Sequence, residues 1–180
     1  MHDDIVEAVK QYEVEAKYRL EENQIHTIFA QLYDFPVKTC SIVDYYYNTT
    51  GFSFRLRYID GDPLVTMKKR VDAENGIVTR EEYEESLTYE QEQFFKQFLQ
   101  ELGYRVDLVV PKIRTMWYLP EAEVAMDQLD GMSTRFLEIE ASAPMIEHVA
   151  EYLGLSQSQI EHRSYPEIWR VFNGASAGIG

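Results

Sequence analysis

The sequence has one cysteine, Cys40, and lacks any run of about 18 apolar residues that could cross a membrane. A single cysteine excludes an internal disulfide framework and any zinc site built from several cysteines. The acidic, polar start of the chain also lacks the basic-then-apolar order of a signal peptide. No P-loop, Gly-x-Ser-x-Gly element or dinucleotide-binding glycine pattern is present. These absences predict a cytoplasmic protein with no membrane partner.

Basic residues are scarce relative to acidic ones. Seventeen Lys and Arg stand against 31 Asp and Glu, which leaves a formal net charge of −14. Such a chain repels nucleic acid and anionic membranes unless its bases gather in one place, so we expect no nucleic-acid partner. The 180 residues, 45% apolar and 27% charged, match one globular domain, and we expect a single domain over residues 1–180.

Most of the chain consists of short alternating segments separated by helical ones. Period-two alternation with β-branched and aromatic residues predicts strands over residues 12–20, 41–47, 51–59, 64–70, 79–87, 105–115, 117–119, 123–129 and 134–141. Helical spacing of apolar residues predicts helices over residues 23–33, 89–102, 144–153 and 164–171, and the glycine-rich residues 174–180 predict a frayed tail. The expected fold class is therefore α+β, with about eight mostly antiparallel strands.

Charged residues alternate with apolar ones along these strands. In the first strand, Glu13, Glu15 and Lys17 share one face, and Val14 and Ala16 share the other. The same parity recurs in seven segments. It collects seven acids and seven bases on one surface: Glu13, Glu15, Glu82, Glu84, Asp127, Glu138 and Glu140, with Lys17, Arg55, Arg57, Lys68, Arg80, Lys112 and Arg114.

Two architectures agree with this alternation. In an open sheet, the charged face lies in water and the apolar face packs on the core. In a closed barrel with helices outside, the apolar face points outward to the helices and the charged face lines the interior. A charged interior of both signs suits a ligand with several negative charges and hard cations, because carboxylates hold Mg²⁺ or Mn²⁺ while Arg and Lys hold phosphate oxygens.

The charged segments also form an ordered series of motifs. They are Glu13-x-Glu15-x-Lys17, Asp44-x-Tyr46, Phe54-Arg55-Leu56-Arg57, Val65-Thr66-Met67-Lys68, Arg80-x-Glu82-x-Glu84, Pro111-Lys112-x-Arg114, Met126-Asp127 with Asp130-Gly131, and Phe136-Leu137-Glu138-Ile139-Glu140. Over about residues 12–168, the series resembles the CYTH superfamily, also called triphosphate tunnel metalloenzymes. Glu161–Tyr165 resembles the ending of its bacterial class IV adenylyl cyclases. The resemblance implies an eight-stranded antiparallel β-barrel, with helices packed outside, whose charged tunnel binds a triphosphate and Mg²⁺ or Mn²⁺.

The resemblance also implies roles for individual residues. The metal ligands would be Glu13, Glu15, Asp127, Glu138 and Glu140. The triphosphate would be bound by Lys17, Arg55, Arg57, Lys68, Arg80, Lys112 and Arg114, and the catalytic residues would be Lys17, Asp127 and Arg114. Asp127 would hold a second metal or orient a water. Lys17 would contact phosphate, protonate a leaving group or pair with Glu15, and Glu82 and Glu84 would brace the neighbouring bases.

Three functions agree with these residues. The first is a metal-dependent triphosphatase acting on inorganic triphosphate, ATP or a similar molecule. The second is a class IV adenylyl cyclase, and the third is a protein that binds nucleotide or polyphosphate without turnover. We place hydrolysis first because those cyclases typically carry a His-Phe pair before the first motif, where this chain has only His2 followed by Asp3. The sequence leaves open the substrate, the preferred metal and the oligomeric state, a homodimer included.

Overall fold

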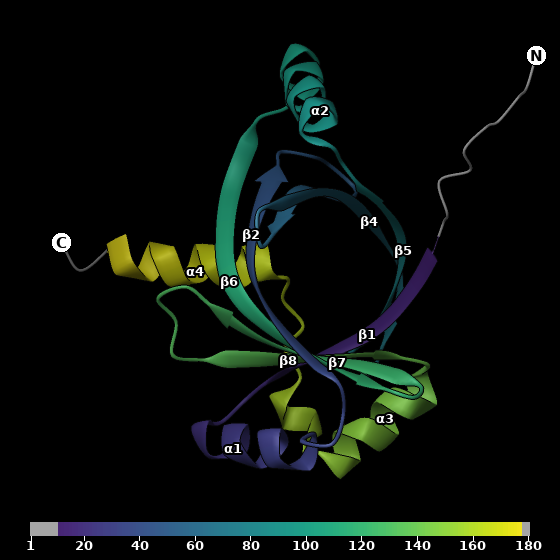
Figure 1. The fold of residues 1–180 in the computed structure, drawn as a ribbon. Coiled ribbons are helices and arrows are strands. Elements are labelled where there is room, and N and C mark those ends of the chain that lie inside the picture. The colour runs from purple at the N-terminus through teal and green to yellow at the C-terminus, as the bar shows by residue number, and fades with distance from the viewer. Residues whose placement is uncertain (1–10, 178–180) are drawn as a thin grey trace, which may run out of the picture.

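The computed structural model describes residues 11–177, which form a closed antiparallel barrel of eight strands (Figure 1). The strands are β1 (Gln11–Arg19), β2 (Val37–Tyr47), β3 (Ser53–Ile59), β4 (Asp62–Glu74), β5 (Ile77–Ser86), β6 (Val106–Leu119), β7 (Ala122–Leu129) and β8 (Arg135–Ala141). Around the barrel they follow the order β1-β5-β4-β3-β2-β6-β7-β8, and β8 pairs with β1 to close the circle. The expected eight-stranded antiparallel barrel is therefore confirmed, and the open sheet is excluded.

Helices lie outside the barrel, as expected. Figure 1 shows α1 (Glu22–Gln31) and α3 (Ala143–Tyr152) together beneath β7 and β8, with α2 (Tyr89–Glu101) at the opposite end and α4 (Tyr165–Ala177) at the side, next to β6. A short 3₁₀ helix, η1 (Gln157–Gln159), precedes α4. Within the part of the chain that the structure describes, no helix has the length and apolar character needed to cross a membrane.

The main hydrophobic core lies between the outer barrel wall and the two lower helices. Trp117 of β6 and Ile139 of β8 are at most 2% exposed, and they belong to one buried cluster with Ile28 of α1 and Ile146 of α3. Residues that alternate with them along the strands, such as Met116 and Glu138, line the interior instead. Strand periodicity thus sends apolar side chains out to the helices and charged side chains inward.

A second apolar cluster closes one end of the barrel interior. It contains Tyr46, Val110, Leu129 and Phe136, which share strand parity with the inward-facing charged residues, together with Tyr165 and Ile168 of α4. Alternation alone had predicted charged residues on this face. The cluster shows that some inward-facing positions of the strands are apolar and pack together. The charged interior is therefore bounded on one side by the start of α4.

Several element boundaries differ from the predicted ones. Residues 105–115 and 117–119 were predicted as two strands, but Met116 continues the alternation and β6 runs unbroken from Val106 to Leu119. The helix α4 extends to Ala177, three residues beyond Gly174, where the frayed tail was expected to begin. Residues 178–180 of that expected tail, and residues 1–10 of the expected domain, lie outside the described residues.

Candidate active site

The barrel interior contains a cavity of about 630 Å³. Eight strands contribute to its walls, because each strand points every second side chain inward. All the predicted site residues except Asp127 line it: Glu13, Glu15, Lys17, Arg55, Arg57, Lys68, Arg80, Lys112, Arg114, Glu138 and Glu140. Glu82 and Glu84 line it as well, beside residues of the segment that leads into α4.

Asp127 shares the inward parity of Glu123 and Ala125 on β7, but it is covered by its neighbours and is not among the residues that line the cavity. Its side chain is fully buried, and its oxygens accept hydrogen bonds from Arg114 Nε at 2.8 Å, Lys112 Nζ at 3.1 Å and the Tyr165 hydroxyl at 2.6 Å. Burial alone would raise the pKa of Asp127, but Arg114 and Lys112 hold it well below its usual range. These three donors occupy the carboxylate, so Asp127 orients the side chains of Arg114, Lys112 and Tyr165. Metal ligation or water activation by Asp127 stays a prediction.

A second buried carboxylate, Asp44 of β2, performs the same task on the other side of β6 from Asp127. Its two oxygens accept hydrogen bonds from Arg57 Nε at 2.6 Å and Arg57 Nη2 at 2.9 Å, and Arg55 Nη1 lies 3.7 Å away. Burial opposes its ionisation, yet Arg55 and Arg57 hold the pKa of Asp44 well below its usual range. In the sequence, Asp44 stands out only as part of the motif Asp44-x-Tyr46. Its parity between the outward-facing Val43 and Tyr45 was the signal that would have placed it inside.

Tyr165, at the start of α4, connects the segment after η1 to two cavity lysines. The Nζ atoms of Lys17 and Lys112 lie 4.2 and 4.3 Å from the centre of its ring, while its hydroxyl group donates to Asp127. Lys17 Nζ also donates to the carbonyl oxygen of Arg163 at 3.1 Å and lies 3.6 Å from Glu138. One role considered for Lys17 was an ion pair with Glu15. In the structure, Glu15 pairs with Arg80 instead.

The remaining cavity residues form ion pairs across neighbouring strands. Lys68 Nζ lies 2.7 and 2.6 Å from the two oxygens of Glu13 and 3.3 Å from Glu82, so Glu82 forms an ion pair with one of the neighbouring bases. Arg114 also contacts Glu138. The Nε atom of Arg55 is buried and has no hydrogen-bond partner within residues 11–177. A buried guanidinium N–H without an acceptor favours binding of an anion in this cavity.

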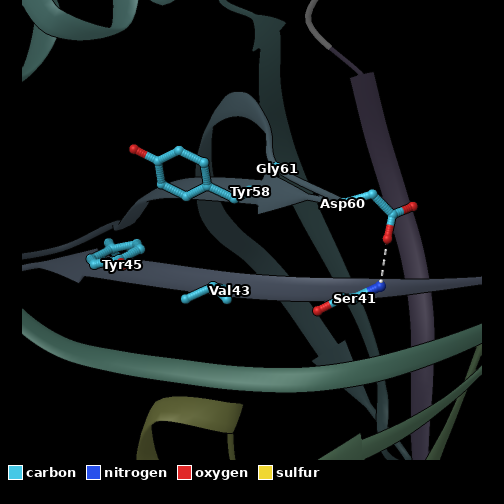
Figure 2. A pocket seen from close by; sticks show the side chains of 6 residues that line it. All are labelled: Ser41, Val43, Tyr45, Tyr58, Asp60 and Gly61. Carbon is cyan, nitrogen blue, oxygen red and sulfur yellow. Dashed lines mark hydrogen bonds between the residues drawn. The ribbon is translucent and has the colours of Figure 1, made fainter.

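A separate hollow lies on the outer wall of the barrel, over β2 and β3. Figure 2 shows its six lining residues, with Tyr45 and Tyr58 projecting to the same side and Asp60 accepting a hydrogen bond from the Ser41 N–H group at 2.8 Å. The two tyrosine rings pack edge to face, 5.5 Å apart. No lysine or arginine lines this hollow, and its one carboxylate already accepts a hydrogen bond, so the hollow lacks the bases expected at a phosphate site.

Comparison with known proteins identifies the family. The sequence profile of the CYTH domain matches residues 11–165. The chain belongs to the CYTH family. A search of curated proteins finds no significant match.

Solved structures share this CYTH fold. The PH1012 protein from Pyrococcus horikoshii OT3 is 25% identical with a TM-score of 0.73, and the match covers 86% of this chain and 98% of that chain. A candidate adenylate cyclase from Vibrio parahaemolyticus is 25% identical with a TM-score of 0.68, covering 88% and 98% of the two chains. HpAC1 from Hippeastrum, at 16% identity and a TM-score of 0.66, covers 90% of this chain and 96% of its own and shares the fold.

The metal site expected of a CYTH protein is not preassembled among the described residues. No three carboxylate, imidazole or thiol groups of residues 11–177 converge in a metal-binding geometry, because Glu13, Glu15 and Glu138 are each paired with a base. Glu140 differs, since it has no hydrogen bond or ion pair within that range. Burial and the neighbouring carboxylate of Glu13 raise its pKa to about 7. The carboxylate oxygens of these four glutamates are donors that suit a hard divalent cation. Such a cation would also neutralise the unpaired carboxylate of Glu140.

Lys112 should take up a proton when a triphosphate binds. Burial, together with the adjacent Arg114, lowers the pKa of Lys112 to about 7, so its side chain is largely neutral at pH 8. A bound anion favours the ammonium form and raises that pKa. We expect wild type to take up about one proton more per bound triphosphate than Lys112→Arg at pH 8, and almost none more at pH 6.

Isothermal titration calorimetry in buffers of different ionisation enthalpy measures this difference. The arginine variant is the matched control, because it keeps the positive charge but does not titrate near neutral pH. Equal proton uptake by the two proteins at pH 8 would show that Lys112 does not change its charge on binding.

Proposed function

We propose that this CYTH protein is a divalent-metal-dependent enzyme that hydrolyses a triphosphate, releasing the terminal phosphate from an inorganic or nucleoside triphosphate. The observation that supports this most strongly is the composition of the interior cavity. It combines eight lysine and arginine side chains with a group of carboxylates from β1 and β8, two strands that pair with each other in the barrel. An anion-binding protein needs the bases alone, whereas cleavage of a phosphoanhydride is aided by both bases and a cation-binding group.

The two buried aspartates support the phosphate-binding half of this proposal. Asp44 orients Arg57, and Asp127 orients Arg114 and Lys112, so two guanidinium groups and one lysine amine are held in place before any ligand binds. Preorganised cations stabilise the charge that spreads over the phosphate oxygens in the transition state, and they do so without further reorganisation. Arg55, whose Nε has no partner among the described residues, adds a free donor.

The carboxylates support the metal-binding half. Glu13, Glu15, Glu138 and Glu140 line the same cavity, and we propose that they hold Mg²⁺ or Mn²⁺ there, with their present basic partners transferred to the phosphates. A bound divalent ion would neutralise phosphate charge and activate water. In the reaction, water adds its oxygen to the terminal phosphorus, the bridging P–O bond breaks, and orthophosphate and a diphosphate leave. We propose that Lys17, whose Nζ lies 3.6 Å from Glu138, donates a proton to the departing oxygen.

Cyclisation of ATP is the second candidate, and one observation favours it. The segment Glu161–Tyr165, which resembles the cyclase ending, is built into the site, because Lys17 contacts both Arg163 and Tyr165. Cyclisation needs the same phosphate clamp, and it also needs the ribose 3′-hydroxyl held in line with the α-phosphorus. Hydrolysis is compatible with the same fold. HpAC1, which shares the fold at 16% identity, is described as having a dominant triphosphatase activity.

A product analysis tests the proposed function. The protein is incubated with inorganic triphosphate and, separately, with ATP, each with Mg²⁺ or Mn²⁺, and the products are separated by chromatography. We expect orthophosphate with pyrophosphate from the first substrate, and orthophosphate with ADP from the second. Cyclic AMP and pyrophosphate as the dominant products from ATP would place the cyclase first. Stoichiometric binding of triphosphate or ATP without any product would favour the third function, a protein that binds these ligands without turnover.

A further inference from the structure

An aromatic side chain from the end of the chain enters the charged cavity. Tyr165, the first residue of α4, lines the cavity and is only 5% exposed. The Nζ atoms of Lys17 on β1 and Lys112 on β6 lie 4.2 and 4.3 Å from the centre of its ring. Because β1 and β6 are not neighbours in the barrel, the ring is a shared contact between two separate parts of the wall.

The ring of Tyr165 is held in place from several directions. Its hydroxyl group donates to Asp127 at 2.6 Å, and Phe136 packs edge to face against it, with 5.8 Å between the ring centres. The first turn of α4 is fixed as well, because the N–H and hydroxyl groups of Ser164 both donate to the carboxylate of Glu167 at 2.7 Å. The ring is therefore positioned before any ligand binds.

The charges around the ring are unequal in number. Three bases, Lys17, Lys112 and Arg114, share the two carboxylates of Asp127 and Glu138. When all three bases are charged, one positive charge is left in excess to attract phosphate. The face of an aromatic ring attracts ammonium groups but carries no negative charge of its own, so it holds the lysines without neutralising that excess. A carboxylate in the same place would compete with phosphate for both lysines.

We propose that Tyr165 is a positioning residue of the triphosphate site, whose ring holds Lys17 and Lys112 so that both ammonium groups face the bound phosphates. The inference rests on the proposed function, because it takes the barrel interior as the triphosphate site. The hydroxyl group has a supporting role, since its hydrogen bond to Asp127 fixes the ring and polarises it toward the cations. In this way α4 contributes a side chain to the site in addition to packing on the barrel.

Two substitutions of Tyr165 separate the effect of the ring from that of the hydroxyl group. Tyr165→Leu removes both, whereas Tyr165→Phe removes the hydroxyl group alone. We expect Tyr165→Leu to raise KM for inorganic triphosphate on the order of tenfold, and to lower kcat several-fold because Lys17 is the proposed proton donor. Tyr165→Phe should recover most of that loss. Tyr165→Met, whose flexible side chain fills the space better, makes the same test if Tyr165→Leu does not fold.

The matched control is Tyr18→Leu, the same substitution on the strand that carries Lys17. Tyr18 is also 5% exposed, but it belongs to the main hydrophobic core outside the barrel and does not line the cavity. We expect Tyr18→Leu to lower the thermal unfolding midpoint and to leave KM unchanged at temperatures where the protein is folded. A loss of packing alone is thereby separated from a loss of lysine positioning.

A binding measurement keeps this test independent of turnover. Inorganic triphosphate is titrated by calorimetry into each protein in EDTA, where metal-dependent turnover stops. About tenfold weaker binding by Tyr165→Leu, with Tyr165→Phe and Tyr18→Leu within about threefold of wild type, supports the inference. That pattern in a protein that forms no product with metal would reject the proposed function alone. An equal loss in Tyr165→Phe or in Tyr18→Leu, no loss in Tyr165→Leu, or no binding to wild type would overturn the inference.

Discussion

Replacing Glu140 by glutamine is expected to lower the rate of triphosphate hydrolysis on the order of a hundredfold without destabilising the fold. Glu140 has no ion pair or hydrogen bond within the described range, and burial, together with Glu13 and other neighbouring acids, raises its pKa. Neutralising it therefore relieves repulsion in the folded protein. The same change removes a carboxylate that we propose as a ligand of Mg²⁺ or Mn²⁺, so activity falls while stability holds or rises.

Steady-state kinetics across a metal titration, combined with thermal unfolding, measures both halves of this result. Glu85→Gln is the matched control, because Glu85 is an exposed acid on β5 that does not line the cavity. EDTA should abolish wild-type turnover, and Mg²⁺ or Mn²⁺ should restore it. Glu140→Gln should need more metal for half-maximal rate. Full wild-type turnover in EDTA, or an unchanged rate and metal requirement in Glu140→Gln, would refute the proposed metal site.

Truncating Asp127 to alanine should produce the largest loss of stability. The change leaves Lys112 and Arg114 buried without their shared counterion and leaves the Tyr165 hydroxyl without its acceptor. Breaking a buried charge pair in this way costs about 3–5 kcal/mol. For a chain of this length, that corresponds to a fall in the thermal unfolding midpoint of roughly 10 °C. Activity at low temperature should fall too, because two phosphate-binding groups lose their orientation.

The exposed pair between Arg170 and Asp107 provides the comparison. Both side chains are about half exposed, at 52% and 45%, so Asp107→Ala should cost only about 0–1 kcal/mol. Asp127→Asn is the milder variant. It keeps the shape and one hydrogen-bond acceptor and should raise KM for triphosphate even where the protein remains folded. An unfolding midpoint of Asp127→Ala close to that of wild type would show that this network does not stabilise the barrel.

Strand periodicity allowed most of the cavity lining to be predicted from the sequence. Arg55 and Arg57 of β3, or Lys112 and Arg114 of β6, alternate with outward-facing residues, and an unbroken strand cannot change that parity. The chemical nature of the site follows from the same residues. Closure of the barrel did not follow, because it depends on the pairing of β1 with both β5 and β8, which sequence spacing does not encode.

The ion-pair partners of individual charged residues could not be predicted either, because they also depend on tertiary packing. Parity places Asp127 inside, but only the packing of α4 shows that Tyr165 and two bases occupy its oxygens. Asp44 could have been assigned to the interior by the same rule, although its pairing with Arg57 depends on the β2–β3 register. Such contacts join residues far apart in the chain, and their geometry is set by tertiary packing.

The most direct test of the triphosphate site is a crystal structure of the protein with inorganic triphosphate and Mn²⁺, using anomalous scattering to locate the metal. We expect triphosphate density inside the barrel against Arg55, Arg57 and Arg114, with an anomalous peak beside Glu140. Lys68 and Arg80 should then exchange their carboxylate partners for phosphate oxygens. Triphosphate bound only outside the barrel, or an interior whose ion pairs stay intact at saturating ligand and metal, would contradict the assignment of this cavity.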